Sequence, residues 1–159
     1  MGEGERGTRD NAGVVAPPPL IYVSALAAGL LANSIYPVRL LPRGIPRALG
    51  LPLVVGGLLI GLLGVREMRR TETNVDPYRP TNAIVDSGPF RFTRNPLYVG
   101  MTLIYGGSSM LANALPAALL LPLVLHLMRH GVIEREEAYL ERKFGEEYLS
   151  YKERVRRWI

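Results

Sequence analysis

Charged and apolar residues alternate in long blocks along this chain. Charged residues are confined to positions 1–10, 39–47, 66–94 and 129–157, and the stretches between them contain no Asp, Glu, Lys or Arg. A soluble domain would instead spread its charges along amphipathic elements. Because a charge at the centre of a bilayer costs roughly 2.5–3.5 kcal/mol, this separation indicates an integral membrane protein.

Two uncharged stretches, residues 19–36 and 48–65, each predict one transmembrane helix. At a rise of about 1.5 Å per residue, both are just long enough for a hydrocarbon core about 30 Å thick. Small residues in a span allow another helix to approach closely. The second stretch predicts such a packing face, made of Gly56, Gly57, Gly61 and Gly64.

The third apolar stretch, residues 97–128, is too long for one span and short for two full ones. Asn113 lies near its middle, and Pro116 follows at a place where proline suits the first turn of a returning helix. We therefore expect a tight helical hairpin, with helices at 97–111 and 114–128.

The tail, residues 133–158, has the pattern of an amphipathic helix. One stripe recurs every three or four positions and consists of Ile133, Glu137, Leu140, Phe144, Tyr148, Tyr151 and Val155. Such a helix can lie on the membrane surface or fold back over the ends of the spans. The expected fold is therefore all-α, with about four transmembrane helices and a cytoplasmic amphipathic C-terminal helix. We expect an N-terminal tail at 1–18 and a single membrane domain at 19–159.

The distribution of lysine and arginine predicts the orientation. With four spans, the N-terminal tail, the 66–96 loop and the C-terminal tail share one side and carry 2, 6 and 8 basic residues. The opposite side carries three, namely Arg39, Arg43 and Arg47. By the positive-inside rule we expect a multi-pass protein of the cell membrane with both termini in the cytoplasm.

Composition excludes several kinds of chemistry. The chain has no cysteine, which excludes disulfides, thiolate metal ligands and a cysteine nucleophile. His126 and His130 share a helix face, a pattern more typical of an interface than of metal binding, and we predict no metal site. The net charge is +5, but acids are interleaved with the basic residues of the tail and no aromatic-basic stripe is present. We therefore expect no nucleic-acid partner.

Candidate functional residues lie on both sides of the predicted hairpin. Arg94 stands next to the N-terminus of the helix beginning near Pro96, where the helix dipole favours an anion such as a cofactor carboxylate. An arginine that merely flanks a span would occupy the same place. Glu137 falls within the apolar stripe of the tail and Glu136 at its edge. A carboxylate on an apolar face needs a partner, although acids in a first helical turn also complement the dipole.

Two motifs flank the hairpin in a fixed order. The first reads G-P-F-R-F-T-R-N-P-L-Y-V-G, and the second reads E-E-A-Y-L followed by F-G-E-E-Y and a further tyrosine. Together they resemble the C-terminal half of the isoprenylcysteine carboxyl methyltransferase and phospholipid methyltransferase superfamily. That family has an Arg-His-Pro-x-Tyr-x-Gly helix start, a hairpin, and then Glu-Glu-x-x-Leu and Phe-Gly-x-x-Tyr. The resemblance covers roughly residues 82–155.

The resemblance implies an integral membrane enzyme that transfers a methyl group from S-adenosylmethionine to a lipid-like or small membrane-partitioning acceptor. It also implies a cytoplasmic cofactor pocket. The residues matched to that pocket by position are Ala83, Ile84, Val85, Phe90, Asn95, Pro96, Leu97, Tyr98 and Glu136, with Glu137 as a rival to Glu136. No catalytic residue is implied.

Two positions depart from the family pattern. Asn95 replaces the usual histidine, which keeps hydrogen-bonding capacity but removes a titratable group. Val132 stands where family members acting on isoprenylcysteine carry an arginine thought to hold the substrate carboxylate. The candidates for binding substrate are then Arg129 and Arg94, and a prenylcysteine carboxylate is not implied.

Two other functions remain open from the sequence. Membrane sterol and enone reductases carry a similar Arg-His-Pro-x-Tyr segment and use NADPH, but they are usually longer and richer in aromatic residues than this chain, which has one Trp. A non-catalytic membrane scaffold whose tail binds a partner is the second alternative. For the methyltransferase, the acceptor can be a lipid amine, a small thiol, an isoprenoid-linked carboxylate or a quinone-like phenol.

Overall fold

The computed structural model describes residues 10–42 and 44–159, and this part of the chain is all-α, as predicted. Residues 1–9 of the predicted N-terminal tail lie outside the described residues. The π-helical turn η2 joins α4 to α5, and the 3₁₀ turn η1 precedes α3. The elements are α1 (Pro18–Ile35), α2 (Ile45–Arg70), η1 (Gly88–Arg91), α3 (Pro96–Leu111), α4 (Leu115–Met128), η2 (Arg129–Ile133), α5 (Glu134–Phe144) and α6 (Glu146–Arg154).

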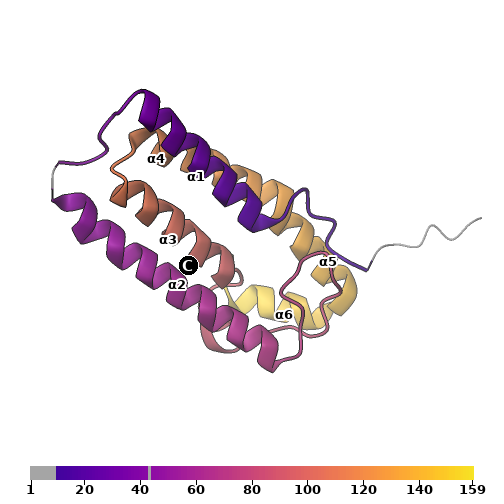
Figure 1. Cartoon of the computed structure of the whole chain (residues 1–159). Helices are drawn as coiled ribbons and strands as arrows, with labels where there is room; N and C mark the ends of the chain where they lie inside the picture. The colour runs from indigo at the N-terminus through magenta and orange to yellow at the C-terminus, as the bar shows by residue number, and fades with distance from the viewer. Residues whose placement is uncertain (1–9, 43) are drawn as a thin grey trace, which may run out of the picture.

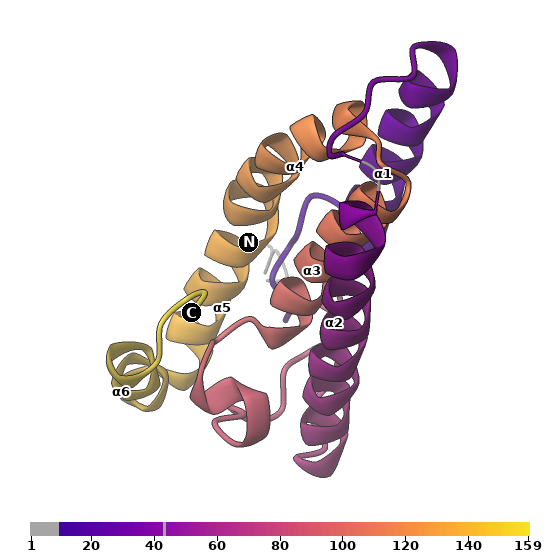
Figure 2. The same cartoon turned by 90° about the vertical axis from the view of Figure 1, so that its left-hand side faces the viewer.

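Four long helices form two pairs. Helix α1 packs against α4 and α2 packs against α3, and the four run side by side in Figure 1. Helices α5 and α6 lie at the end of the bundle where α3 begins, together with the loop that follows α2. In Figure 2, α5 continues the line of α4 and α6 crosses the end of this long rod. Charged residues therefore gather at one end of the apolar bundle.

In the part of the chain that the structure describes, three helices are long and apolar enough to cross a membrane, and they span Pro18–Ile35, Ala48–Arg70 and Leu115–Phe144. They support a multi-pass membrane protein. Helix α3 has 16 residues and is thus only about 24 Å long, so the count of four spans stays a prediction. The 30 residues of Leu115–Phe144 extend about 45 Å, beyond a hydrocarbon core of about 30 Å. The charged residues of α5 can therefore project past the membrane.

The hairpin between α3 and α4 has the expected turn. Asn113 has φ 48°, a left-handed conformation that asparagine tolerates better than most residues. Its side-chain amide donates to the carbonyl of Leu41 at 3.0 Å, and its side-chain oxygen accepts from the Leu41 N–H at 2.8 Å. This pair joins the hairpin turn to the loop between α1 and α2.

The tail differs from the single helix predicted at 133–158. It consists of α5 and α6, which are separated at Gly145, and this residue has φ 53° and ψ −127°. Such a conformation is accessible essentially only to glycine. The predicted stripe nevertheless includes buried positions on both helices, because Glu137, Tyr148 and Tyr151 are all buried.

Helices α2 and α3 approach each other at two pairs of glycines. A Cβ added to Gly57 would lie 2.5 Å from the carbonyl oxygen of Gly100, and one added to Gly100 would lie 2.7 Å from the carbonyl oxygen of Gly57. Gly50 and Gly107 repeat this arrangement at 2.8 and 2.7 Å. A methyl group at any of these positions would collide with backbone, which cannot move aside as a side chain can.

The predicted packing face on α2 is confirmed in part. Gly57 faces α3, and a Cβ at Gly64 would lie 2.8 Å from the side chain of Leu97. At Gly56 and Gly61, in contrast, a Cβ would meet nothing within 4 Å. The close approach therefore depends on only some of the glycines that the sequence offered.

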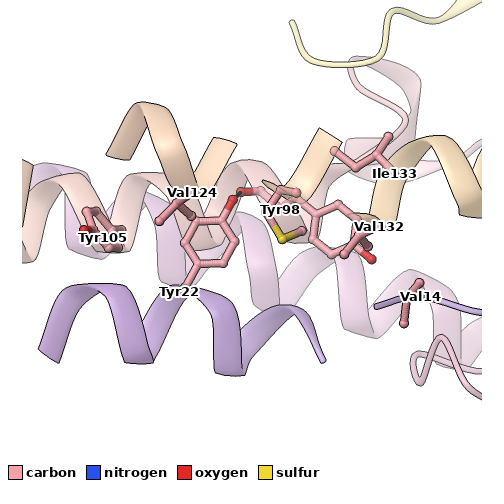
Figure 3. Packing of buried hydrophobic residues seen from close by; sticks show 8 residues of the cluster. Val14, Tyr22, Tyr98, Tyr105, Val124, Val132 and Ile133 are labelled. Carbon is pink, nitrogen blue, oxygen red and sulfur yellow. Dashed lines mark hydrogen bonds between the residues drawn. The ribbon is translucent and has the colours of Figure 1, made fainter. Parts of the chain in front are cut away.

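Buried aromatic residues fill the space between the two helix pairs. Figure 3 shows Tyr22 of α1 beside Val124 of α4, and Tyr98 of α3 belongs to the same buried cluster. The hydroxyl groups of Tyr22 and Thr102 share a hydrogen bond of 2.8 Å. The hydroxyl of Tyr105 donates to the carbonyl of Ala117 at 2.8 Å. Because each buried hydroxyl has a partner, the apolar core tolerates these polar groups.

The glycine contacts predict a difference between two adjacent substitutions. We expect Gly57→Ala to lower the stability of the protein by roughly 1–3 kcal/mol, because its methyl group would collide with the backbone of α3. Gly56→Ala is the control, and it should leave stability unchanged or raise it, since alanine favours a helix. Thermal unfolding in detergent measures both. Equal melting temperatures for the two variants would contradict this account of the packing.

Candidate functional site

A cavity lies at the end of the bundle where α3 begins. Its walls come from the loop after α2, η1, the first turn of α3, and α5 and α6. The empty volume is about 890 Å³, including the part that is open to solvent at the mouth. Clefts that combine apolar walls with a few polar groups commonly bind small organic ligands and cofactors.

The cavity brings together most of the residues that the sequence singled out. All ten candidate cofactor-binding residues line it: Ala83, Ile84, Val85, Phe90, Asn95, Pro96, Leu97, Tyr98, Glu136 and Glu137. Arg94 lines it as well. Arg129 does not belong to the lining. Its side chain is 56% exposed and its Nε pairs with the carboxylate of Glu134 at 3.0 Å.

Tyr98 and Glu136 join the start of α3 to the start of α5. Pro96 begins α3, where its missing N–H costs no helical hydrogen bond, and this places Tyr98 in the first turn. The buried hydroxyl of Tyr98 donates to Oε1 of Glu136 at 2.7 Å. A hydrogen bond to a carboxylate is stronger than one between neutral groups, so it holds Glu136 in a defined position at the cavity.

Glu137 occupies a different environment from Glu136. Its side chain is 8% exposed and lies between two arginines. Nη2 of Arg94 lies 3.2 Å from Oε1. Arg157 donates from Nε to Oε1 at 3.0 Å and from Nη2 to Oε2 at 2.7 Å. The carboxylate on the apolar stripe therefore has the partners that its burial requires.

Arg94 is buried without full use of its hydrogen-bonding capacity. Its side chain is 8% exposed, and Nε and Nη1 have no hydrogen-bond partner within the described part of the chain. Unpaired buried donors are unfavourable, and more so on a charged group. Arg94 also lines the cavity, and a guanidinium is a group that pairs readily with an anion.

The segment after α6 returns to the start of α3. The Arg94 N–H donates to the carbonyl of Arg156 at 2.9 Å. The Thr93 hydroxyl and the Asn95 side-chain amide both donate to the carbonyl of Arg157, at 3.1 and 2.9 Å. Asn95 therefore lines the cavity with its amide nitrogen already engaged. No sequence pattern indicated this contact, because the partners are backbone carbonyls.

Two tyrosines of α6 complete the wall near η1. The hydroxyl of Tyr151 donates to the carbonyl of Phe90 at 2.9 Å. Burial raises the pKa of Tyr151 above its ordinary value. Burial also raises the pKa of Tyr148, and the negative charge of Glu137 adds to this effect. Both hydroxyls thus stay protonated at neutral pH.

Thr73 shapes the part of the loop that contributes Ala83, Ile84 and Val85. Its buried hydroxyl accepts the N–H groups of Asn82 and Ala83 at 3.0 and 3.1 Å, and donates to the carbonyl of Ala83 at 3.2 Å. One side chain thereby fixes the backbone ahead of the cavity wall. Thr73 was not among the predicted site residues, since a single threonine in a loop gives no recognisable signal.

Tyr139 links the N-terminal segment to the same loop. Its hydroxyl donates to Oδ1 of Asp10 at 2.8 Å and accepts the Thr81 N–H at 3.2 Å. Ala12 then reaches the cavity lining. Ala12 and Tyr139 were not among the predicted site residues, although Tyr139 lies within the E-E-A-Y-L motif directly after Glu136 and Glu137.

The charges at the cavity are largely paired, because Glu137 binds Arg94 and Arg157, and Asp76 lies 3.6 Å from Arg79. The charged lining residues are three carboxylates and one guanidinium, namely Asp76, Glu136, Glu137 and Arg94. Apolar side chains, including Ile84, Val85, Phe90 and Leu97, form much of the remaining wall. Within residues 10–42 and 44–159, no cluster of three or more His, Asp or Glu is placed to hold a metal ion.

Comparison with known protein families identifies the family of this chain. The model of the phospholipid methyltransferase family matches residues 45–147, and the chain belongs to this family. The resemblance seen in the two motifs is thereby confirmed.

Two relatives match parts of the chain. The protein-S-isoprenylcysteine O-methyltransferase of Schizosaccharomyces pombe is 36% identical over 72 residues, which are 45% of this chain and 30% of that protein. An uncharacterized protein of Haemophilus influenzae is 67% identical over 27 residues, which are 17% of this chain and 43% of that protein. The chain thus spans less than half the length of either relative. No solved structure matches it.

The contacts of α6 predict different effects for its two tyrosines. Tyr151→Phe leaves the buried carbonyl of Phe90 without its donor and should destabilise the protein by about 1–3 kcal/mol. Tyr148→Phe is the matched control, because Tyr148 is buried on the same helix and its hydroxyl has no hydrogen-bond partner among the described residues. Chemical denaturation in detergent measures both. A larger loss for Tyr148→Phe would contradict the assignment of the contact.

Proposed function

We propose that this chain transfers the methyl group of S-adenosylmethionine to a lipid-like or small membrane-partitioning acceptor. Membership of the phospholipid methyltransferase family supports the type of reaction. The observation that carries the choice of cofactor is the presence of a held carboxylate, Glu136, and a partly unpaired guanidinium, Arg94, in one cavity.

The charges of S-adenosylmethionine match this cavity group by group. The molecule carries a sulfonium, an ammonium and a carboxylate, so its net charge is positive. In our proposal Glu136, held by Tyr98, accepts the ammonium group through Oε2, and Nε and Nη1 of Arg94 donate to the carboxylate. The apolar walls would enclose the adenosine. Glu137 is not assigned to the cofactor, because two arginines already occupy it.

The same charges argue against NADPH. A nicotinamide dinucleotide phosphate carries three phosphate groups, and each would need cationic or backbone N–H partners. The lining offers one guanidinium against three carboxylates. Bringing several phosphates beside these carboxylates would be unfavourable, which favours the methyltransferase over a reductase.

Methyl transfer requires positioning more than acid–base chemistry. When bound, S-adenosylmethionine supplies an electrophilic methyl group, which the acceptor's lone pair attacks as the carbon–sulfur bond breaks and its electrons stay on sulfur. The chain's own residues hold the two ends of the amino-acid group and exclude water with the apolar walls. Correct alignment of two reactants can be worth roughly 7–11 kcal/mol of the barrier. An acceptor bearing a proton would lose it to water.

The membrane helices support an acceptor that partitions into lipid. The polar cofactor would enter from the side of the charged segments, which we propose to be cytoplasmic together with both termini. The position that carries arginine in enzymes acting on isoprenylcysteine is Val132, which is fully buried in the apolar core. Arg129, the candidate nearby, is outside the cavity. We therefore include lipid amines, small thiols and quinone-like phenols among the acceptors to test.

Binding of S-adenosylhomocysteine by the detergent-purified protein tests the proposal. We expect micromolar affinity by calorimetry, and a loss of about 10- to 100-fold in Glu136→Gln and in Arg94→Gln, because each removes a charged hydrogen bond worth about 1.5–3 kcal/mol. Arg129→Gln is the control for Arg94→Gln and should bind like the wild type.

The outcome separates the candidate functions. Transfer of label from methyl-labelled S-adenosylmethionine to a membrane extract would follow from binding. If a folded sample bound NADPH and neither S-adenosylmethionine nor its product, the proposal would be wrong and the reductase would replace it. A folded sample that bound none of the three ligands would favour the scaffold.

A further inference from the structure

We propose that Arg157 is a positioning residue for the cofactor site, and that it acts by occupying Glu137 so that Arg94 remains available to an anionic ligand. This inference rests on the proposed function, because the ligand group concerned is the cofactor carboxylate. It assigns a role to a segment after α6 that lies beyond residues 45–147, where the family model matches.

The two arginines contact Glu137 to different extents. Arg157 reaches both carboxylate oxygens, with Nε 3.0 Å from Oε1 and Nη2 2.7 Å from Oε2. Arg94 reaches only Oε1, through Nη2 at 3.2 Å. A two-pronged contact is the favoured arrangement between a guanidinium and a carboxylate. Glu137 is therefore bound mainly by Arg157.

This division leaves Arg94 with unused capacity. Two guanidinium groups share one carboxylate, so one positive charge remains at the buried side chain of Arg94, whose Nε and Nη1 lack partners. If the Arg157 cation were absent, Glu137 would have Arg94 as its remaining close cation. If Arg94 then formed a bidentate pair with Glu137, guanidinium N–H groups that now lack partners would no longer be available to a ligand. The Glu137 carboxylate would also repel an incoming anion.

The backbone of the segment does not depend on the Arg157 side chain. The carbonyl of Arg156 accepts from the Arg94 N–H, and the carbonyl of Arg157 accepts from Thr93 and Asn95. Trp158 also packs against the core. A substitution of the Arg157 side chain should therefore leave the segment in place, so that its effect reports on charge.

Two ligands that differ at one end provide the test. S-adenosylhomocysteine carries the amino-acid group, whereas 5′-deoxy-5′-methylthioadenosine has a methyl group in its place. We expect Arg157→Gln to weaken binding of S-adenosylhomocysteine at least tenfold and to change binding of methylthioadenosine less than threefold. Arg156→Gln is the matched control, because it removes an equal charge from an exposed neighbour. It should bind both ligands like the wild type.

A second substitution distinguishes positioning from a merely structural role. In the double variant Glu137→Gln/Arg157→Gln, no carboxylate remains to occupy Arg94, and we expect affinity for S-adenosylhomocysteine to recover to within about threefold of wild type. If the Glu137–Arg157 pair served only to hold two segments together, removing Glu137 as well would not restore the affinity for S-adenosylhomocysteine. Binding of methylthioadenosine checks that the pocket of each variant is folded.

Each result has a defined consequence. Equal losses for both ligands in Arg157→Gln, or no loss for either, would overturn the inference while leaving the proposed function intact. A double variant that binds methylthioadenosine normally and S-adenosylhomocysteine poorly would overturn it as well. Failure of the wild type to bind S-adenosylhomocysteine would instead remove the proposed function on which the inference rests.

Discussion

The burial of one carboxylate organises the charged end of this protein. Glu137 lies on a face of α5 that packs against the rest of the molecule, and a carboxylate there needs cations. Arg94 comes from the segment before α3 and Arg157 from the segment after α6, so one ion cluster joins three parts of the chain. The same cluster leaves a guanidinium at the cavity with donors to spare. The same ion cluster thus both joins these segments and leaves donors of Arg94 without partners.

The membrane explains why this site lies at the end of the bundle. Charged side chains are excluded from the apolar lengths of α1, α2 and α4, so they gather where the helices leave the hydrocarbon. Helices α2 and α3 pack through reciprocal glycine contacts, which bring the start of α3 close to the end of α2. The loop after α2 can then form one wall of the cavity while α5 forms another. An amphiphilic reaction partner and a polar cofactor could meet at this boundary.

Much of this architecture could be predicted from the sequence, for identifiable reasons. Exclusion of charge marks the apolar helices, and Asn113 followed by Pro116 marks the hairpin turn. The resemblance to the family implied ten cofactor-binding residues, and all ten line one cavity. Whether those residues bind a cofactor is a question for the binding experiments.

Other features of the structure could not be predicted from the sequence. The break at Gly145 was missed because Phe144 and Tyr148 keep the four-residue spacing of a continuous helix. The segment ending at Trp158 binds through backbone carbonyls, which no side-chain pattern reveals. Arg129 stays a predicted substrate ligand, and its Nε lies 3.0 Å from the Glu134 carboxylate, outside the cavity.

The measurement that tests the central claim most directly is an experimental structure of the protein with S-adenosylhomocysteine bound. The account predicts the ligand in the cavity at the start of α3, with its carboxylate at Nε and Nη1 of Arg94 and its ammonium group at Glu136. Glu137 should remain paired with Arg157. A ligand bound elsewhere, or one in this cavity with its carboxylate turned away from Arg94, would contradict the account.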